Sequence, residues 1–254
     1  MLTIKNLQVK VNRASRLERT VIQDLSLHVK AGEFVQIIGN NGAGKSTLFH
    51  ALSGHMPLAA GRIEIGGQDI SAWPYFKRPA LISRVLQDPG LAVMDQMSIE
   101  ENLSFALLRG RCRTLRLHKT VSRLSFFKDR LEQLGMGLEL RWDEPCSHLS
   151  GGQRQALSLV MATLIPSKLL LLDEITAALD PKMADLVMKL TAKIVEEQKQ
   201  TTMMITHNMS HALHYGDRII LLGAGRIIKE YTAEEKAKLT PLDLAAVFEE
   251  AAQA

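Results

Sequence analysis

A glycine-rich segment with one lysine and two hydroxyl residues reads GNNGAGKST. It has the spacing G-x-x-x-x-G-K-[ST], in which glycines let successive backbone N–H groups turn toward a phosphate. We expect Lys45 to neutralise the terminal phosphates of a nucleotide and the Ser46 hydroxyl to bind Mg²⁺. A glycine-rich β-turn would also fit the glycines, but a predicted strand before the segment and a predicted helix after it favour the phosphate site. The predicted phosphate-binding residues are Gly39, Asn40, Asn41, Gly42, Ala43, Gly44, Lys45, Ser46 and Thr47.

Two acidic residues follow a short apolar run, KLLLLDE, at the positions of Asp173 and Glu174. A buried parallel strand of this kind would end beside the phosphate loop, at the edge where open α/β sheets bind ligands. We therefore predict that Asp173 holds Mg²⁺, directly or through water. Glu174 is predicted to orient and polarise the attacking water. Taken alone, the pair fits equally well a strand followed by an acidic helix cap.

A second anion-binding pattern, LSGGQRQ, spans residues 149–155. Its small residues precede a predicted helix and expose backbone N–H groups at the start of that helix. One nucleotide does not need two complete phosphate cradles from a single chain. The pattern therefore predicts that Ser150, Gly151, Gly152 and Gln153 cap the γ-phosphate bound by a second copy of the chain.

Together the three patterns resemble the ATP-binding cassette (ABC) ATPase family, whose signature is LSGGQ. The resemblance extends over nearly the whole chain. It implies that the chain is an ATP hydrolase with ATP and Mg²⁺ as its ligands. It also implies a two-fold homodimer with two ATP molecules at the interface, because each chain has one phosphate loop and one signature. ATP binding would close this dimer, and hydrolysis would reopen it.

Three further residues take their roles from the resemblance. Gln87, in VLQDP, matches the Q-loop glutamine, which would approach Mg²⁺ and the attacking water. Asp180, in TAALD, matches the D-loop, which would cross the dimer interface. His207, in MITHNM, matches the switch histidine that contacts the γ-phosphate. Taken separately, the same residues would be a loop amide, a helix cap and a structural histidine at a strand end.

The chain departs from the family pattern at two positions. Members commonly stack an aromatic residue on adenine, but the matching position lies near Val11, and no Phe, Tyr or Trp precedes Phe34. Contact from the basic segment 10–19 and weak base selectivity are the two alternatives. Ile175 stands where a proline usually follows the catalytic glutamate. This change alters backbone stiffness but removes no reacting group.

These residues need a framework of strands and helices to bring them together. The apolar pattern predicts strands over 2–9, 21–29, 33–38, 61–65, 81–86, 169–172, 202–206 and 218–222. Helices are expected over 45–53, 157–165, 181–197 and 241–254, and a mostly helical, basic stretch over 98–145.

The alternation of strands and helices predicts an α/β fold. With the family resemblance, it becomes a P-loop NTPase-type core with a mostly parallel sheet, an antiparallel β subdomain and an inserted α-helical subdomain. We expect a single ABC ATPase domain over 1–254. Residues 1–87 and 151–254 would form the α/β core with its β subdomain, and residues 88–150 the helical subdomain.

The composition of the 254 residues is that of a globular protein, with 46% hydrophobic and 23% charged residues. It excludes a mainly disordered chain. Only Cys112 and Cys146 occur, which excludes a disulfide scaffold and indicates reduced cytosolic thiols. No apolar run approaches the roughly 18 to 20 residues of a membrane span. The net charge is +4, yet the window 109–130 alone carries +7, which predicts a local basic patch.

Most single-cassette members of this length serve membrane transporters, so the resemblance implies a subunit that powers one from the cytoplasmic face of the membrane. The stretches GQRQALSLVMATL and DEITAALDP resemble ATPases of an importer group that pairs a permease with an extracytoplasmic binding protein. Small solutes, with aromatic amino acids as a suggested class, are the expected cargo. The coupling surface would be the loop 88–96 and the basic window 109–130, which would contact the permease or anionic lipid unless it is a solvated helix face.

A non-transport ABC ATPase, such as a cytosolic assembly factor, is the main alternative. DNA-maintenance members usually carry long coiled-coil insertions, and this chain has none. A small-molecule kinase shares the phosphate loop but leaves LSGGQ without a role. Nucleic-acid binding is not expected, because the basic run has little aromatic interleaving beyond Phe126 and Phe127.

Overall fold

The computed structural model describes residues 1–12, 15–110 and 121–253. Six strands form its central sheet in the order β10-β9-β3-β8-β7-β6. Neighbours from β9 to β6 run parallel, and only β10 is antiparallel to its neighbour. The strands are β3 (Phe34–Gly39), β6 (Ile82–Val85), β7 (Leu169–Asp173), β8 (Thr202–Ile205), β9 (Arg218–Gly223) and β10 (Arg226–Tyr231). This arrangement confirms the α/β fold with a mostly parallel sheet.

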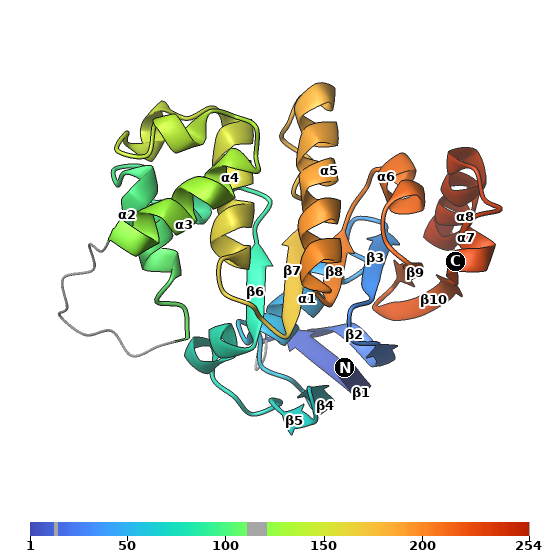
Figure 1. Ribbon diagram of the computed structural model, residues 1–254. Helices are drawn as coiled ribbons and strands as arrows, with labels where there is room; N and C mark the ends of the chain where they lie inside the picture. The colour runs from blue at the N-terminus through green and yellow to red at the C-terminus, as the bar shows by residue number, and fades with distance from the viewer. Residues whose placement is uncertain (13–14, 111–120, 254) are drawn as a thin grey trace.

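The central sheet is buried on both faces, because successive side chains of a strand point to opposite sides. In β7, Leu169 and Leu171 join one apolar cluster and Leu170 and Leu172 join another. This is why four consecutive leucines form a strand here. The first cluster contains helix α1 (Lys45–Ser53), and the second contains α4 (Gly151–Thr163) and α5 (Pro181–Gln198). Helices α1 and α4 therefore lie on opposite faces of the sheet (Figure 1).

A second, antiparallel sheet packs on the α1 side, in the order β2-β1-β4-β5. Its strands are β1 (Leu2–Val11), β2 (Arg19–Val29), β4 (Ala60–Ile65) and β5 (Gln68–Asp69). Alternate residues of β1, such as Leu2 and Ile4, are buried with the side chains of α1. This sheet matches the predicted antiparallel β subdomain.

Between β6 and α4 the described chain is helical or in turns. It contains α2 (Ile99–Ala106), α3 (Val121–Glu132) and short 3₁₀ turns at Pro89–Leu91, Leu138–Leu140 and Cys146–His148. Helices α2 and α3 pack beside α4 (Figure 1), and Leu103, Phe127 and Leu131 join the cluster around α4. Their helical character agrees with the sequence. The division into a core and a subdomain of residues 88–150 stays a prediction.

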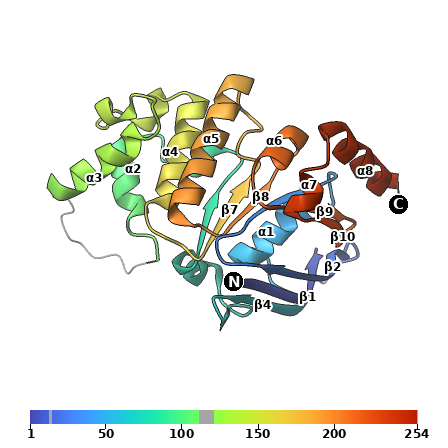
Figure 2. The same ribbon diagram turned by 45° about the vertical axis from the view of Figure 1, so that its right-hand side comes forward.

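The C-terminal part adds α6 (Met209–His214), α7 (Ala233–Lys236) and α8 (Pro241–Gln253) at the β9–β10 end of the central sheet (Figure 2). A third apolar cluster joins Ala212 of α6 and Leu244 of α8 to Ile219 and Leu221 of β9. No helix among the described residues is long and apolar enough to cross a bilayer.

The prediction of an exposed basic patch over residues 109–130 is wrong for Arg109. The guanidinium of Arg109 donates hydrogen bonds to the carbonyls of Ala162 and Ile165, just where α4 ends, and it is therefore not a free surface charge. A cation at a helix C-terminus satisfies carbonyls that have no partner within the helix. Residues 111–120 of the window, Cys112 included, lie outside the described residues. Lys128 and Arg130 lie over the rings of Trp142 and Phe126.

Candidate nucleotide site

The loop between β3 and α1 wraps around its own lysine. Lys45 Nζ donates hydrogen bonds to the carbonyl oxygens of Gly39, at 2.6 Å, and Asn40, at 3.1 Å. Its side chain is buried, and burial lowers the pKa of Lys45 while the charges of Glu174 and Asp173 oppose that shift. A cation is thus held at the mouth of the loop and faces the two acidic residues predicted beside it.

The loop geometry depends on glycine at two places. Gly44 has φ of +101°, and an added Cβ there would come within 2.8 Å of a methyl carbon of Ile22. At Gly39 an added Cβ would come within 2.3 Å of the Leu222 carbonyl oxygen. Gly44 is the N-cap of α1 and no described side chain caps this helix. Its first N–H groups therefore stay available to an anion, with Asn41, Gly42 and Ser46 exposed beside them and Ala43 and Thr47 more buried.

The two acidic residues lie at the end of β7 as the sequence predicts: Asp173 is its last residue and Glu174 follows it. Glu174 has a left-handed backbone with φ of +47°, which is strained for a residue with a side chain. Its N–H donates to the carbonyl of Ile205 at 3.1 Å, which ties it to the end of β8. Its Oε1 lies 2.6 Å from Nε2 of His207, which is the second residue after β8. Two positions that were predicted separately are thus in direct contact.

Asp173, by contrast, is engaged by a residue that the sequence did not single out. Its Oδ2 accepts from Arg84 Nη2 at 2.5 Å, and both side chains are largely buried. Arg84 belongs to β6, beside β7, and precedes Gln87 by three positions. No motif marks an arginine on a strand, so only the fold could reveal this pair.

The predicted Mg²⁺ ligands are a hydroxyl, an amide and a carboxylate, on Ser46, Gln87 and Asp173. Hard oxygen donors of this kind suit Mg²⁺, which keeps several waters and takes further ligands from phosphate. Ser46 begins α1, Gln87 is exposed just beyond β6, and Asp173 ends β7. The charge of Asp173 acts on the neighbouring Lys45 and opposes the lowering of its pKa by burial. The donor set therefore fits the ion, and the assignment remains a proposal.

The LSGGQ segment forms the start of α4. The Ser150 hydroxyl accepts from the Gln153 N–H at 3.2 Å, and the Gln153 side chain accepts from the Ser150 N–H at 3.0 Å. This capping box fixes where the helix begins. An added Cβ at Gly151 would meet nothing within 4 Å, whereas one at Gly152 would come within 2.3 Å of the Met183 side chain. Gly152 is thus needed for packing on α5, and Gly151 faces open space.

Asp180 is the N-cap of α5, and its Oδ1 accepts from the Met183 N–H at 3.1 Å. Asp180 is therefore a helix cap, as one of the two interpretations of the sequence predicted. Its role at the dimer interface stays a prediction. A cavity of about 520 Å³ lies beside it and is lined by Glu174, His207 and Asp185 among others.

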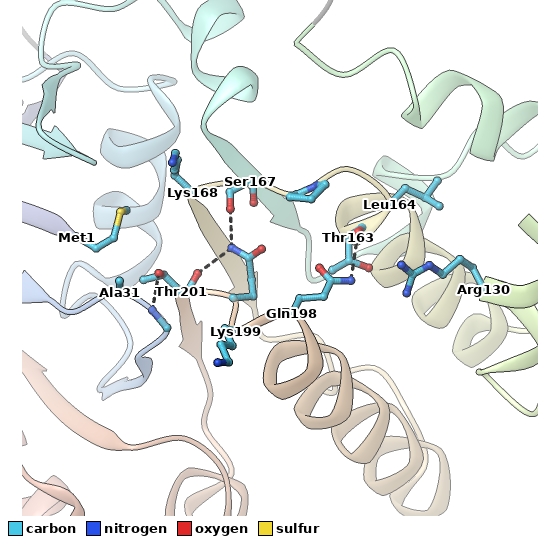
Figure 3. Close-up of a pocket in the computed structure, with 13 residues that line it drawn as sticks. Met1, Ala31, Arg130, Thr163, Leu164, Ser167, Lys168, Gln198, Lys199 and Thr201 are labelled. Carbon is cyan, nitrogen blue, oxygen red and sulfur yellow. Dashed lines mark hydrogen bonds between the residues drawn. The ribbon is translucent and has the colours of Figure 1, made fainter. Parts of the chain in front are cut away.

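The structure gathers the phosphate loop, Asp173, Glu174 and His207 at the carboxyl ends of β3, β7 and β8. A cavity of about 420 Å³ at the opposite edge contains none of the residues predicted to bind the nucleotide or Mg²⁺ (Figure 3). There Gln200 donates hydrogen bonds to the carbonyls of Ser167 and Thr201. Because this cavity lies before β7 and β8 begin, it is separate from the candidate site.

Comparisons with known proteins identify the family of the chain. A family model described as ABC transporter matches residues 22–177. The chain is 42% identical over 252 residues to a tyrosine transport ATP-binding protein from Clostridioides difficile (strain R20291), covering 98% of this chain and 99% of the relative. It is 36% identical over 223 residues to a phosphonates import ATP-binding protein from Nostoc sp. (strain PCC 7120 / SAG 25.82 / UTEX 2576), covering 84% and 86%.

Solved structures have the same fold. A dimeric post-hydrolysis state of the ATP-binding cassette MJ0796 with ADP and Pi superposes with a TM-score of 0.77 at 24% identity, covering 92% of this chain and 99% of the other. A component of an ABC transporter complex from Clostridium perfringens, cbiO1, has a TM-score of 0.77 at 27% identity, covering 92% and 89%. With the family match and the 42% identical relative, these findings establish that the chain belongs to the ABC transporter family as an ATP-hydrolysing cassette.

Proposed function

We propose that the chain is the ATPase subunit of an importer for aromatic amino acids, and that two copies enclose two ATP molecules. The observation that carries the two-chain site is the placement of α1 and α4 on opposite faces of the central sheet. Each helix has an N-terminus suited to an anion, yet the sheet separates the helices. A two-fold partner would bring its α4 N-terminus to the phosphate held by the first chain.

Within this site the chain's own residues divide the work. Lys45 and the N–H groups at the start of α1 bind the β- and γ-phosphates. Glu174 accepts a proton from the attacking water, and His207 holds the carboxylate in position from 2.6 Å. Ser46, Gln87 and Asp173 would hold Mg²⁺, which when bound neutralises charge on the transferring phosphate.

The signature segment would sense whether the γ-phosphate is present. Ser150 and Gly151 of the partner add hydrogen-bond donors beside that phosphate, on the side away from Lys45. Loss of the γ-phosphate removes the charge that these donors bind, and the two chains separate. Residues 88–150 lie between Gln87 and the signature, so we propose that this segment carries the motion to the transporter.

The proposed cargo rests on the relatives. The relative with 42% identity over almost its whole length bears the name of a tyrosine transport protein, and the next is named for phosphonates import. We therefore propose import of a small aromatic amino acid, with integral-membrane permease subunits and an extracytoplasmic binding protein as partners. The ATPase would sit on the cytoplasmic face of the membrane. A cytosolic assembly factor is the alternative outcome of the test below.

The test traps the closed state in the native host. We would express tagged Glu174→Gln, solubilise the membranes with ATP and Mg²⁺, and identify the proteins that co-purify. A multi-span permease together with a binding protein that takes up labelled tyrosine, phenylalanine or tryptophan supports the proposal. Soluble cytosolic partners alone would replace it with the assembly-factor function.

Lys45→Ala in the Glu174→Gln background is the matched control. It leaves the Gln side chain in place and removes the charge that binds ATP. We expect it to lose the ATP-dependent dimer. If a permease is captured but its binding protein takes up none of the three amino acids, the transporter assignment stands and the cargo assignment is wrong.

A further inference from the structure

Two arginines, Arg78 and Arg84, have contrasting surroundings. Arg78 is buried, and its guanidinium donates to four backbone carbonyls, those of Ala51, Leu52, Ser71 and Trp73. Its hydrogen bonds tie the end of α1 to the turn that precedes β6. An arginine satisfied in this way is a fixed structural anchor.

Arg84 is held quite differently. Its Nη2 donates to Asp173 Oδ2 at 2.5 Å, while its Nε is buried and has no hydrogen-bond partner among the described residues. An orphaned buried donor costs free energy, so the guanidinium is not fully satisfied where it lies. Among the described residues, the Asp173 carboxylate is the one group that forms an ion pair with this guanidinium.

The charges around this pair explain the contact. Asp173 and Glu174 are adjacent carboxylates, and the cations recorded beside them are Lys45 and Arg84. The charge of Arg84 also reaches His50 and His55, where burial first and then Arg84 lower the pKa of each imidazole. The burial of both histidines disfavours their charged forms, whereas Arg84 brings its charge into direct contact with Asp173.

We propose that Arg84 is a positioning residue that acts as an internal counter-cation for Asp173 and competes with Mg²⁺ for that carboxylate. The inference rests on the proposed role of Asp173 as a metal ligand. A divalent ion arriving at Asp173 must repel the guanidinium, because like charges in a poorly solvated site interact strongly. Asp173 is therefore occupied until a metal–nucleotide complex brings enough binding energy to displace or share its partner.

The position of Arg84 would couple this competition to the signature helix α4. Arg84 precedes Gln87 by three positions, and Gln155 of α4 donates a hydrogen bond to the carbonyl of Leu86 between them. A shift of Arg84 away from Asp173 would therefore move a strand end that contacts the signature helix. Binding of the metal would thus change the position of β6 and α4 through the ion pair between Arg84 and Asp173.

Metal uptake measures the competition directly. Mn²⁺ serves as the probe, with a non-hydrolysable ATP analogue, and bound Mn²⁺ is followed by loss of the free-ion paramagnetic resonance signal. Removal of the charge in Arg84→Met or Arg84→Gln is expected to lower the half-saturating Mn²⁺ concentration by about three- to tenfold. Arg84→Lys keeps the charge and is expected to stay close to the wild type. Unchanged or raised half-saturation in both neutral variants would overturn the proposal.

Two controls separate the possible failures. Arg62→Met removes an arginine whose partners, Glu64 and Asp69, lie on the exposed second sheet, and it should leave Mn²⁺ uptake unchanged. Asp173→Asn should raise the half-saturating concentration. If Asp173→Asn matches the wild type, the metal role of Asp173 in the proposed function is wrong. If it weakens uptake while the neutral Arg84 variants change nothing, the role of Arg84 alone is wrong.

The unfolding midpoint without metal or nucleotide gives a second readout. Arg84→Met leaves Asp173 beside Glu174 without its counter-cation, so the midpoint should fall, and saturating Mn²⁺ with the ATP analogue should restore it. If Arg84→Met fails to fold, Arg84→Gln and Arg84→Lys still decide the question. Equal Mn²⁺ half-saturation in these two variants contradicts the competition.

Discussion

Glu174 Oε1 and His207 Nε2 lie 2.6 Å apart, although the two residues follow different strands. The contact joins the ends of β7 and β8, which are neighbours in the sheet. Glu174 is only 15% exposed in its side chain and His207 is 40% exposed. The histidine therefore covers the carboxylate from the solvent side and limits the directions from which water can reach it.

The first prediction concerns this pair. His207→Ala removes the group that orients Glu174, so kcat for ATP hydrolysis should fall by about 10²- to 10⁴-fold. ATP affinity should change little, because Lys45 and the phosphate loop stay intact. Steady-state phosphate release and nucleotide titration measure the two effects. His214→Ala, on the same side of the fold in α6, is the control, and a His207→Ala enzyme with normal kcat would remove His207 from the mechanism.

The second prediction tests the signature segment through its cap. Ser150→Arg places a bulky charge at the α4 N-terminus, so it should block ATP-dependent dimer formation and spare nucleotide binding by the monomer. Size-exclusion chromatography with light scattering, in a Glu174→Gln background, measures the dimer.

The control for this variant is Thr232→Arg. Thr232 caps α7 with the same capping box, reciprocated by Glu235, but away from the candidate site. Each variant removes a helix cap, so each should destabilise its own helix, α4 or α7, by about 1 kcal/mol. Only Ser150→Arg should lose the dimer, and an ATP-dependent dimer of normal strength in that variant contradicts the shared site.

The third prediction separates packing from ligand approach at adjacent glycines. Gly151→Ala puts a methyl group into open space, so the fold should keep its stability while ATPase activity falls, because the partner's phosphate must come close to this backbone. Gly152→Ala pushes against Met183 and should lower the unfolding midpoint. Thermal unfolding and phosphate release of both variants give the comparison, and full activity of Gly151→Ala would argue against close approach.

The fourth prediction is a pH dependence outside the site. Lys236 Nζ donates to the carbonyls of Tyr215 and Gly216, and burial lowers its pKa from 10.5 to about 8. Between about pH 8 and 10.5 the unfolded chain therefore binds a proton that the folded chain has lost. Folding stability then rises with pH in this window and is reduced below it.

Lys236→Met removes this titration. The free energy of unfolding of the wild type relative to Lys236→Met should therefore increase as the pH rises from 8 to 10.5. Urea unfolding at several pH values measures the difference, in which other titrating groups cancel. A difference that is flat across this range would show that the amine is not forced toward its neutral form.

The sequence predicted the strands that carry the site because they are short, apolar and buried on both faces. Helix α1 has the bounds that were predicted, and β7 differs by one residue. Strand β10 and helix α6 were missed. RIIKEY has only one fully buried residue, so no apolar alternation marks β10, and the six residues of α6 are too few for a helical period.

The site shows the same limit. Motifs name the residues that can bind phosphate or move a proton, since loop chemistry depends on local residue types. They cannot reveal contacts between segments far apart in the chain, such as that of Arg84 with Asp173, 89 positions later. Register between β6 and β7 creates that contact, and register is a property of the folded sheet.

The separation of α1 and α4 by the central sheet also has a kinetic consequence. In the proposed two-chain site, no single chain can complete its own catalytic centre, so turnover per chain depends on how often two chains meet. Dilute, unattached copies would then be idle and consume little ATP. A permease that holds two copies side by side would raise their effective concentration and switch them on. The geometry of one sheet would thus confine fuel use to assembled transporters.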